Sequence, residues 1–178
     1  LPGMMAHIDK ALHPNSLRNK PKWLVTFLNM RKHLGLLSLW FLLIHVLMSA
    51  LLVGPQYYAK FYVDPKDALS RMNLKGESSL FLGILGTGLY TIMGICSLPP
   101  IAETMTHRQW HLIFGPLAWM ALICGTLHVA VQGINAWANP ASQAKWPWGI
   151  PPITLISVLF PFGVIVLKIF QVIFGYVM

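Results

Sequence analysis

The sequence predicts an all-α fold, a polytopic bundle of helices that span a membrane. Three observations lead to this fold class. The 178 residues are 56% hydrophobic and only 10% charged, whereas ordinary globular domains are roughly 25% charged. Apolar stretches recur at about 20 residues, the length a helix needs to cross about 30 Å of hydrocarbon. Most basic residues flank these stretches, which favours aqueous ends of spans and excludes a nucleic-acid-binding surface.

Four stretches have the length and composition of membrane spans. They are residues 34–53, 79–98, 112–135 and 151–172. The second stops before Pro99-Pro100, a pair that ends helices, and a Trp-rich loop follows the third. In the fourth, Pro161 is expected to kink the helix, and Lys168 is close enough to its end to extend into water.

Charge bias predicts the orientation of these spans. The densest basic cluster precedes the first span, and the positive-inside rule assigns it to the cytoplasm. Its members are Lys10, Arg18, Lys20, Lys22, Arg31 and Lys32. Residues 1–33 are therefore predicted to be a cytoplasmic segment and residues 34–178 a four-helix domain whose C-terminus is also cytoplasmic. Because the chain opens on Leu1-Pro2-Gly3, like the end of a helix entered part-way, an upstream span is expected to precede it.

Histidine carries the chemistry that the sequence suggests. Of seven histidines, only His45 and His128 lie deep in predicted spans, where an ionisable side chain is costly and marks a functional site by default. They stand eight residues before Val53 and seven before Asn135, or roughly 10–12 Å from the outer ends of their helices. Since the first and third spans run in the same direction, the two imidazoles are expected at one level, an arrangement that holds a haem in helical bundles.

A purely structural role for these histidines stays open, in which each bonds to a neighbouring carbonyl or to Ser49 or Thr126. The matched depth makes the ligand interpretation about equally strong. A second haem between His33 and His111 is rejected. The intervals to the deeper histidines are 12 and 17 residues, and at about 100° per residue neither brings two histidines of one helix onto one face.

The glycines of the second and third spans have two possible roles. Gly83, Gly86 and Gly88 lack the spacing of a dinucleotide-binding turn and favour close helix packing. Gly125, one turn before His128, either leaves room for a flat macrocycle or serves packing in the same way.

Several motifs together resemble the membrane domain of the STEAP metalloreductases, and the resemblance covers nearly the whole chain. They are Pro21-Lys22-Trp23-Leu24, Arg31-Lys32-His33-Leu34-Gly35-Leu36-Leu37-Ser38 with a histidine seven residues on, Ser97-Leu98-Pro99, the Arg108 loop and Leu127-His128. In that family six helices bind one haem b near the outer face and FAD near the inner face, and assemble as a homotrimer. This chain would be the last four helices. Most members also carry an N-terminal NADPH-binding domain.

The resemblance assigns residues to each cofactor. It implies that His45 and His128 ligate the haem, in agreement with their spacing. It places Tyr90 between flavin and haem, although core packing explains a mid-span tyrosine equally well. The flavin would lie beside Arg31, Lys32, His33 and Arg108, with Trp23 against the adenine. Relatives typically have Gln-Ser-Lys where this chain has Phe114-Gly115-Pro116, so weak FAD binding is expected.

The predicted function is therefore transmembrane electron transfer. Electrons from a cytoplasmic flavin, supplied by NADPH where a further domain exists, would pass through one bis-histidine haem b to an external ferric or cupric chelate. The protein would be an integral protein of the plasma or endosomal membrane. The basic residues of the loop after the first span either attract an anionic chelate or form a plain solvated loop. Two alternatives remain: a different cytochrome b that carries electrons, and a non-enzymatic channel or assembly protein.

Overall fold

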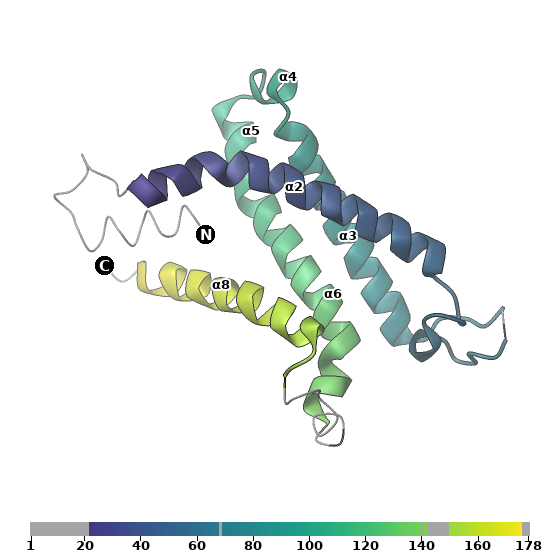
Figure 1. Ribbon diagram of the computed structural model, residues 1–178. Helices are drawn as coiled ribbons and strands as arrows, with labels where there is room; N and C mark the ends of the chain where they lie inside the picture. The colour runs from purple at the N-terminus through teal and green to yellow at the C-terminus, as the bar shows by residue number, and fades with distance from the viewer. Residues whose placement is uncertain (1–21, 68, 140, 142–149, 176–178) are drawn as a thin grey trace.

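A computed structural model of the protein describes residues 22–67, 69–139, 141 and 150–175. Within these residues every regular element is a helix (Figure 1), and one isolated β-bridge joins Tyr62 to Met72. The all-α fold class is therefore confirmed. The longer helices are α2 (Lys22–Leu52), α3 (Leu74–Cys96), α6 (Ala118–Ala138) and α8 (Ile153–Gly175); the shorter ones are η1 (Ala59–Phe61), α4 (Pro99–Ala102), α5 (His107–Leu112) and η2 (Ile113–Leu117). Most of the Trp-rich loop, residues 142–149, lies outside the described residues.

Among the described residues, four helices are long and apolar enough to cross a membrane. These are His33–Leu52, Leu74–Cys96, His107–Ala138 and Ile153–Phe174. The third combines α5, η2 and α6 into one span of 32 residues. The chain thus has the architecture of an integral membrane protein, whose backbone polar groups are satisfied inside helices.

Helix α2 begins well before the apolar stretch that predicts it. The expected span starts at residue 34, whereas the chain is already helical at Lys22, the first residue that the structure describes. A helix propagates cheaply once formed, because each added residue contributes one backbone hydrogen bond. Arg31, Lys32 and His33 therefore lie on the same helix as His45.

Helix α3 also begins earlier than expected, at Leu74 and not at Ser79. Asn73 is its N-cap, and its side-chain oxygen accepts a hydrogen bond from the Gly76 N–H at 2.9 Å. Its amide nitrogen donates to the Lys60 carbonyl at 2.9 Å, which ties the loop to the helix start. Capping by asparagine stabilises a helix by about 1 kcal/mol, so a cap within the charged loop moves the boundary.

The third span contains a π-helical turn at Ile113–Leu117 with Pro116 inside it. Proline has no N–H and its ring collides with the carbonyl one turn earlier, so a helix that continues through it must widen or bend. The span starts at His107 because Thr106 and Gln109 form a capping box. The predicted start, residue 112, is one and a half turns later.

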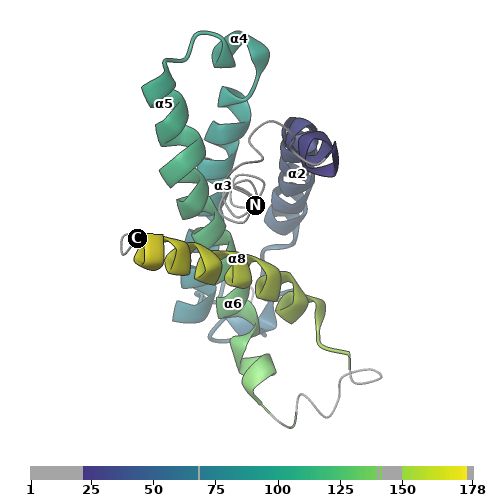
Figure 2. The same ribbon diagram turned by 90° about the vertical axis from the view of Figure 1, so that its left-hand side faces the viewer.

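Helices α3 and α6 are the most closely packed pair (Figures 1 and 2). A Cβ added to Gly83 would lie 2.9 Å from the His128 ring, and one added to Gly86 would lie 3.3 Å from the Cys124 Cβ. The packing role expected for these two glycines is therefore confirmed. It is wrong for Gly88, whose added Cβ would meet nothing within 4 Å.

The remaining helices flank this pair. Helix α8 crosses α6 (Figure 2) and is joined to it by a 3.2 Å hydrogen bond from the Trp137 indole to the Thr154 hydroxyl. Helix α2 contacts α3 and exposes large apolar side chains along its length, including Trp40 and Phe41, each 62% exposed. Such an apolar surface suits lipid or another subunit.

Candidate functional site

His128 lies in the interface between α6 and α3. Its Nδ1 is 2.7 Å from the Ser79 carbonyl oxygen and 3.3 Å from the Ser79 hydroxyl. A carbonyl oxygen can only accept, so Nδ1 carries the proton and donates it to Ser79. The Nε2 atom is then the acceptor, and the Gln132 amide nitrogen donates to it at 3.0 Å. These bonds assign the neutral Nδ1–H tautomer to His128.

The surroundings of this imidazole are built from small and polar residues. Ser79 is only 2% exposed, the most buried side chain of the described residues. The Gln132 amide also donates to the Ser79 hydroxyl at 3.0 Å. The ring lies against Gly83, where any Cβ would collide with it. Ser79, Gly83 and Gln132 thus hold His128 in one orientation.

His45 lies on α2, and its side chain is exposed. It stands seven residues before the end of α2 at Leu52, while Ser79 stands five after the start of α3 at Leu74. At 1.5 Å per residue these intervals are about 10 Å and 8 Å. The loop between α2 and α3 joins these two helix ends. His45 and Ser79, the hydrogen-bond partner of His128, therefore lie at similar distances from that loop.

The structure brings His128 together with Ser79 and Gln132, and no hydrogen bond of the described residues joins it to His45. Sequence reasoning expected a structural partner in Ser49 or Thr126, but the Thr126 hydroxyl bonds to the Leu122 carbonyl at 2.7 Å. Ser79 and Gln132 were missed. Gln132 could have been found from the sequence, because it is a glutamine one turn after His128 in an otherwise apolar span. Ser79 could not, because residue spacing does not give the register between two helices that are distant in the sequence.

Gly125 faces open space, since a Cβ added there would meet nothing within 4 Å. It lies one turn before His128 on α6. A flat group could approach the α6 backbone at this position without collision. The other role considered for Gly125 is helix packing, and the open space at its Cβ position does not support that role.

Tyr90 links α3 to α2. Its hydroxyl contacts the Ser38 hydroxyl and lies 3.5 Å from the Gly35 carbonyl oxygen. The Ser38 hydroxyl in turn donates to the Gly35 carbonyl at 2.9 Å. The tyrosine therefore has the bonded, packed position of a structural residue. It also lies between the level of His128 and the end of α3 at Cys96.

The residues assigned to the flavin lie on two helices. Trp23, Arg31 and Lys32 are on α2, and their side chains lie outside the described part. His33 is exposed on α2, and Arg108 is exposed on α5. Among the described residues, no hydrogen bond, ion pair or ring contact joins these groups.

Phe114-Gly115-Pro116, the segment that replaces the Gln-Ser-Lys typical of relatives, has a structural role of its own. The Phe114 ring packs against Trp110 with centroids 4.7 Å apart, and Pro116 lies inside the π-helical turn. These two positions contribute apolar packing and no polar group for a phosphate.

The loop between α2 and α3, together with the first turn of α3, holds four basic and three acidic residues. They are Lys60, Lys66, Arg71 and Lys75, against Asp64, Asp67 and Glu77. The Asp64 carboxylate accepts the Lys66 N–H at 3.0 Å, and the Asp67 carboxylate accepts the Leu69 N–H at 2.9 Å. These two acids therefore form turns within the loop and are not paired with its lysines.

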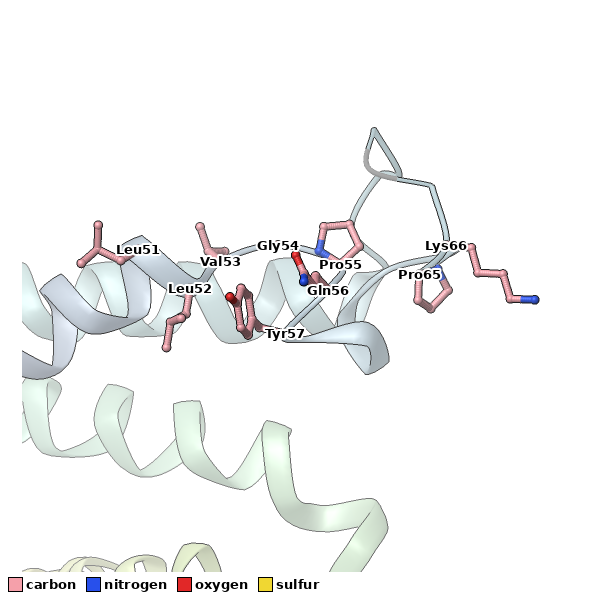
Figure 3. Close-up of a pocket in the computed structure, with 9 residues that line it drawn as sticks. All are labelled: Leu51, Leu52, Val53, Gly54, Pro55, Gln56, Tyr57, Pro65 and Lys66. Atoms are coloured by element: carbon pink, nitrogen blue, oxygen red, sulfur yellow. The ribbon is translucent and has the colours of Figure 1, made fainter.

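A pocket of about 510 Å³ lies at the end of α2 (Figure 3). Its lining residues are Leu51, Leu52, Val53, Gly54, Pro55, Gln56, Tyr57, Pro65 and Lys66. The Lys66 side chain extends away from the other labelled residues (Figure 3). The pocket is therefore mainly apolar and does not gather the basic groups of the loop.

Comparison with known proteins gives one family match and several relatives. Residues 4–124 match the family described as "Ferric reductase like transmembrane component". The chain is 27% identical to Metalloreductase STEAP2 of Homo sapiens, an alignment that covers 95% of this chain and 36% of that protein. It is 26% identical to Metalloreductase STEAP2 of Mus musculus, with 94% and 36% covered, and 25% identical to Metalloreductase STEAP3 of Rattus norvegicus, with 94% and 36% covered. The chain thus spans 36% of the length of these curated relatives.

Proposed function

Because the chain belongs to the ferric reductase-like transmembrane family, we propose that it transfers electrons across a membrane to a ferric or cupric chelate. The comparisons confirm the resemblance to STEAP metalloreductases along nearly the whole chain. An oxidoreductase activity follows from this resemblance. Since the chain spans 36% of those relatives, the activity is proposed for the protein in which this domain acts.

We propose that the domain binds one haem b through His45 and His128. When bound, this group supplies reversible one-electron chemistry at iron. The observation that carries the proposal is the tautomer of His128: Nδ1–H donates to the Ser79 carbonyl, the bond that histidine ligands of metals commonly make through their second nitrogen. That bond leaves the lone pair on Nε2, the atom a ligand must use. Gln132 must release Nε2 for this role, because its amide donates to the same atom.

The chain's own residues have distinct tasks in this proposal. Ser79 orients His128, and Gly83 gives its ring room against α3. Gly125 leaves the α6 surface open one turn away. His45 and His128 would hold the haem iron, and the group would supply electron transfer to an acceptor that does not bind the metal.

The electron donor is proposed to be a flavin at the opposite end of the bundle. Arg31, Lys32 and Arg108 would meet the phosphates of FAD, with His33 and Trp23 nearby, and Tyr90 would lie between the two cofactors. Phe114 and Pro116 offer no polar contact, which supports weak binding. NADPH would act through a domain outside this chain.

The acceptor would dock at the loop between α2 and α3, on the outer face in the orientation that the basic N-terminal segment predicts. Two of its three acids, Asp64 and Asp67, accept backbone N–H groups in turns and are not paired with its lysines, which supports the proposal that the lysines attract an anionic chelate. The C-terminus would then be cytoplasmic, in a plasma or endosomal membrane. A homotrimer is proposed on the family resemblance, and the apolar surface of α2 is compatible with subunit contacts.

A non-enzymatic helical assembly is the second candidate, and one observation favours it. Both nitrogens of His128 already have partners within the α3–α6 interface. The visible spectrum of purified, dithionite-reduced protein separates the candidates. Sharp α and β bands of six-coordinate haem are expected, and they should disappear in His45→Leu and in His128→Leu but persist in His33→Leu. If wild-type protein purified from haem-replete cells lacks these bands, the haem proposal is wrong and the non-enzymatic helical assembly is the candidate that remains.

A further inference from the structure

A pair of exposed histidines lies at the end of the bundle opposite the loop between α2 and α3 (Figure 1). His107 and His111 are one turn apart on α5, and their ring centroids are 4.4 Å apart with the planes at 71°. Both side chains are exposed, and among the described residues neither imidazole has a hydrogen-bond partner. Their nitrogens are therefore free to bind something that the chain itself does not supply.

The separation of the ring centroids is close to that of two imidazoles held at about 90° on one metal ion, and shorter than the separation in a tetrahedral site. In zinc sites the ligating nitrogen lies about 2.0–2.1 Å from the metal, which puts each ring centroid about 3.2 Å from it. Two such rings at about 90° around the ion have centroids about 4.5 Å apart, and at a tetrahedral angle about 5.2 Å. The observed 4.4 Å is close to the first value. An edge-to-face contact between the rings alone gives the same distance without a ligand, so the free nitrogens are the point to test.

The helix that carries the pair is held in place on both sides. Thr106 accepts from the Gln109 N–H and the Gln109 side chain accepts from the Thr106 N–H, which fixes the first turn of α5. The helix continues through η2 into α6, and Trp110 packs against Phe114 on the same segment. Two ligands on a preordered helix lose little conformational entropy when they bind one ion.

The donor set indicates the class of cation. Helix α5 carries no carboxylate, and imidazole alone suits zinc, copper and nickel, whereas calcium and magnesium need oxygen ligands. We propose that His107 and His111 form a binding site for a borderline divalent cation such as Zn²⁺, with water in the remaining positions. This site is distinct from the proposed haem site, because its histidines lie a different distance along the third span from His128 and are not needed to hold a haem. Arg108, which is proposed to meet the flavin, lies between the two histidines on α5.

The test is calorimetric titration of Zn²⁺ into the full chain, purified in detergent without a histidine tag. His107→Gln and His111→Gln should each weaken the binding about tenfold or more, because each leaves a single ligand where two acted together. A matched control keeps two histidines but breaks their spacing: His111→Gln combined with Leu112→His should bind as weakly as the single variants. His13→Gln should bind as the wild type does.

Helicity measured by circular dichroism establishes that each variant is folded. Excess Mg²⁺ should not displace Zn²⁺. The proposal is overturned if either single variant retains wild-type affinity, if the respaced pair binds as well as the original, or if the folded wild type takes up no Zn²⁺ in the micromolar range. A wild-type haem spectrum in both single variants would separate this site from the proposed electron-transfer function.

Discussion

The two proposed haem ligands differ in what they do for the protein alone, and this difference predicts unequal effects of one substitution. His128 makes hydrogen bonds through both ring nitrogens inside the α3–α6 interface. His45 is exposed on α2 and makes none among the described residues. Replacing each with leucine should abolish haem binding in both cases, yet destabilise the haem-free protein only at His128.

The magnitude follows from the bonds that are lost. A hydrogen bond between membrane helices contributes about 0.6 kcal/mol on average and about 1.7 kcal/mol at most. Only the bond to Ser79 joins two helices, because Gln132 lies on α6 with His128; together the two bonds amount to about 1–2 kcal/mol. Ser79 keeps its own helical hydrogen bond, and the Gln132 amide still donates to the Ser79 hydroxyl. We therefore expect His128→Leu to lower the free energy of unfolding by about 1–2 kcal/mol, a factor of about 5–30 in the folded-to-unfolded ratio.

For His45→Leu the expected change is within about 0.5 kcal/mol, as for other exposed substitutions. The assay is unfolding by sodium dodecyl sulfate in mixed micelles, followed by circular dichroism, on protein prepared without haem. The free energy of unfolding should be higher for haem-loaded wild-type protein than for either variant, because a ligand that binds only the folded state stabilises it. Gln132→Leu should lower the free energy of unfolding less in the His128→Leu protein than in the wild type. The hydrogen bond between Gln132 and His128 is already absent in that variant.

Two results would refute this reasoning. Equal destabilisation by the two substitutions would mean that the contacts of His128 with Ser79 and Gln132 contribute nothing. Normal haem binding in folded His128→Leu would remove His128 from the ligand set, and with it the single-haem proposal.

Three further predictions concern the surroundings of these histidines and the two ends of the bundle. Gly83→Ala should broaden or shift the haem spectrum because its Cβ would lie 2.9 Å from the His128 ring, whereas Gly88→Ala, with open space, should not; identical spectra for both would show that the ring is not held against α3. Titrated FAD should bind weakly, and Arg31→Ala with Arg108→Ala should weaken it further; an unchanged affinity would place the flavin elsewhere. Reoxidation of reduced protein by ferric citrate should become slower between 0.1 M and 1 M salt, as the Debye length falls from about 10 Å to about 3 Å. Reoxidation by a cationic ferric complex should not become slower over the same range. Equal responses to salt would exclude steering by the loop lysines.

Hydropathy predicts the number and type of the helices because it depends on composition over about 20 residues, and the bilayer allows few other structures. It predicts their boundaries less well. The helix around His45 extends back to Lys22, and the second begins at the Asn73 cap. The start of the second helix is set by the hydrogen bond between the Asn73 side chain and the Gly76 N–H, about which hydropathy carries no signal. Pro116 is the converse case, a helix breaker that the third span accommodates with a π-helical turn.

The candidate site shows the same division. Depth along a helix is fixed by residue count, so the sequence could place His45 and His128 at one level without any structure. Rotation and register between helices are not fixed by count. They depend on packing at small residues, here Gly83 and Gly86, and this packing decides that Ser79 receives the His128 N–H.

The deciding atom for the function is therefore Nε2 of His128. The bond from Nδ1 to the Ser79 carbonyl is needed whether the imidazole is structural or a metal ligand, because each role requires a fixed, neutral ring. What separates the roles is the partner of Nε2, which in this structure is the Gln132 amide at 3.0 Å. That amide also has Ser79 as an acceptor at 3.0 Å, so it can give up Nε2 and keep a hydrogen bond. Exchange of this one bond for a bond to iron would release one of the two amide N–H groups of Gln132, while the other keeps its hydrogen bond to Ser79, so the exchange would cost the interface a single hydrogen bond.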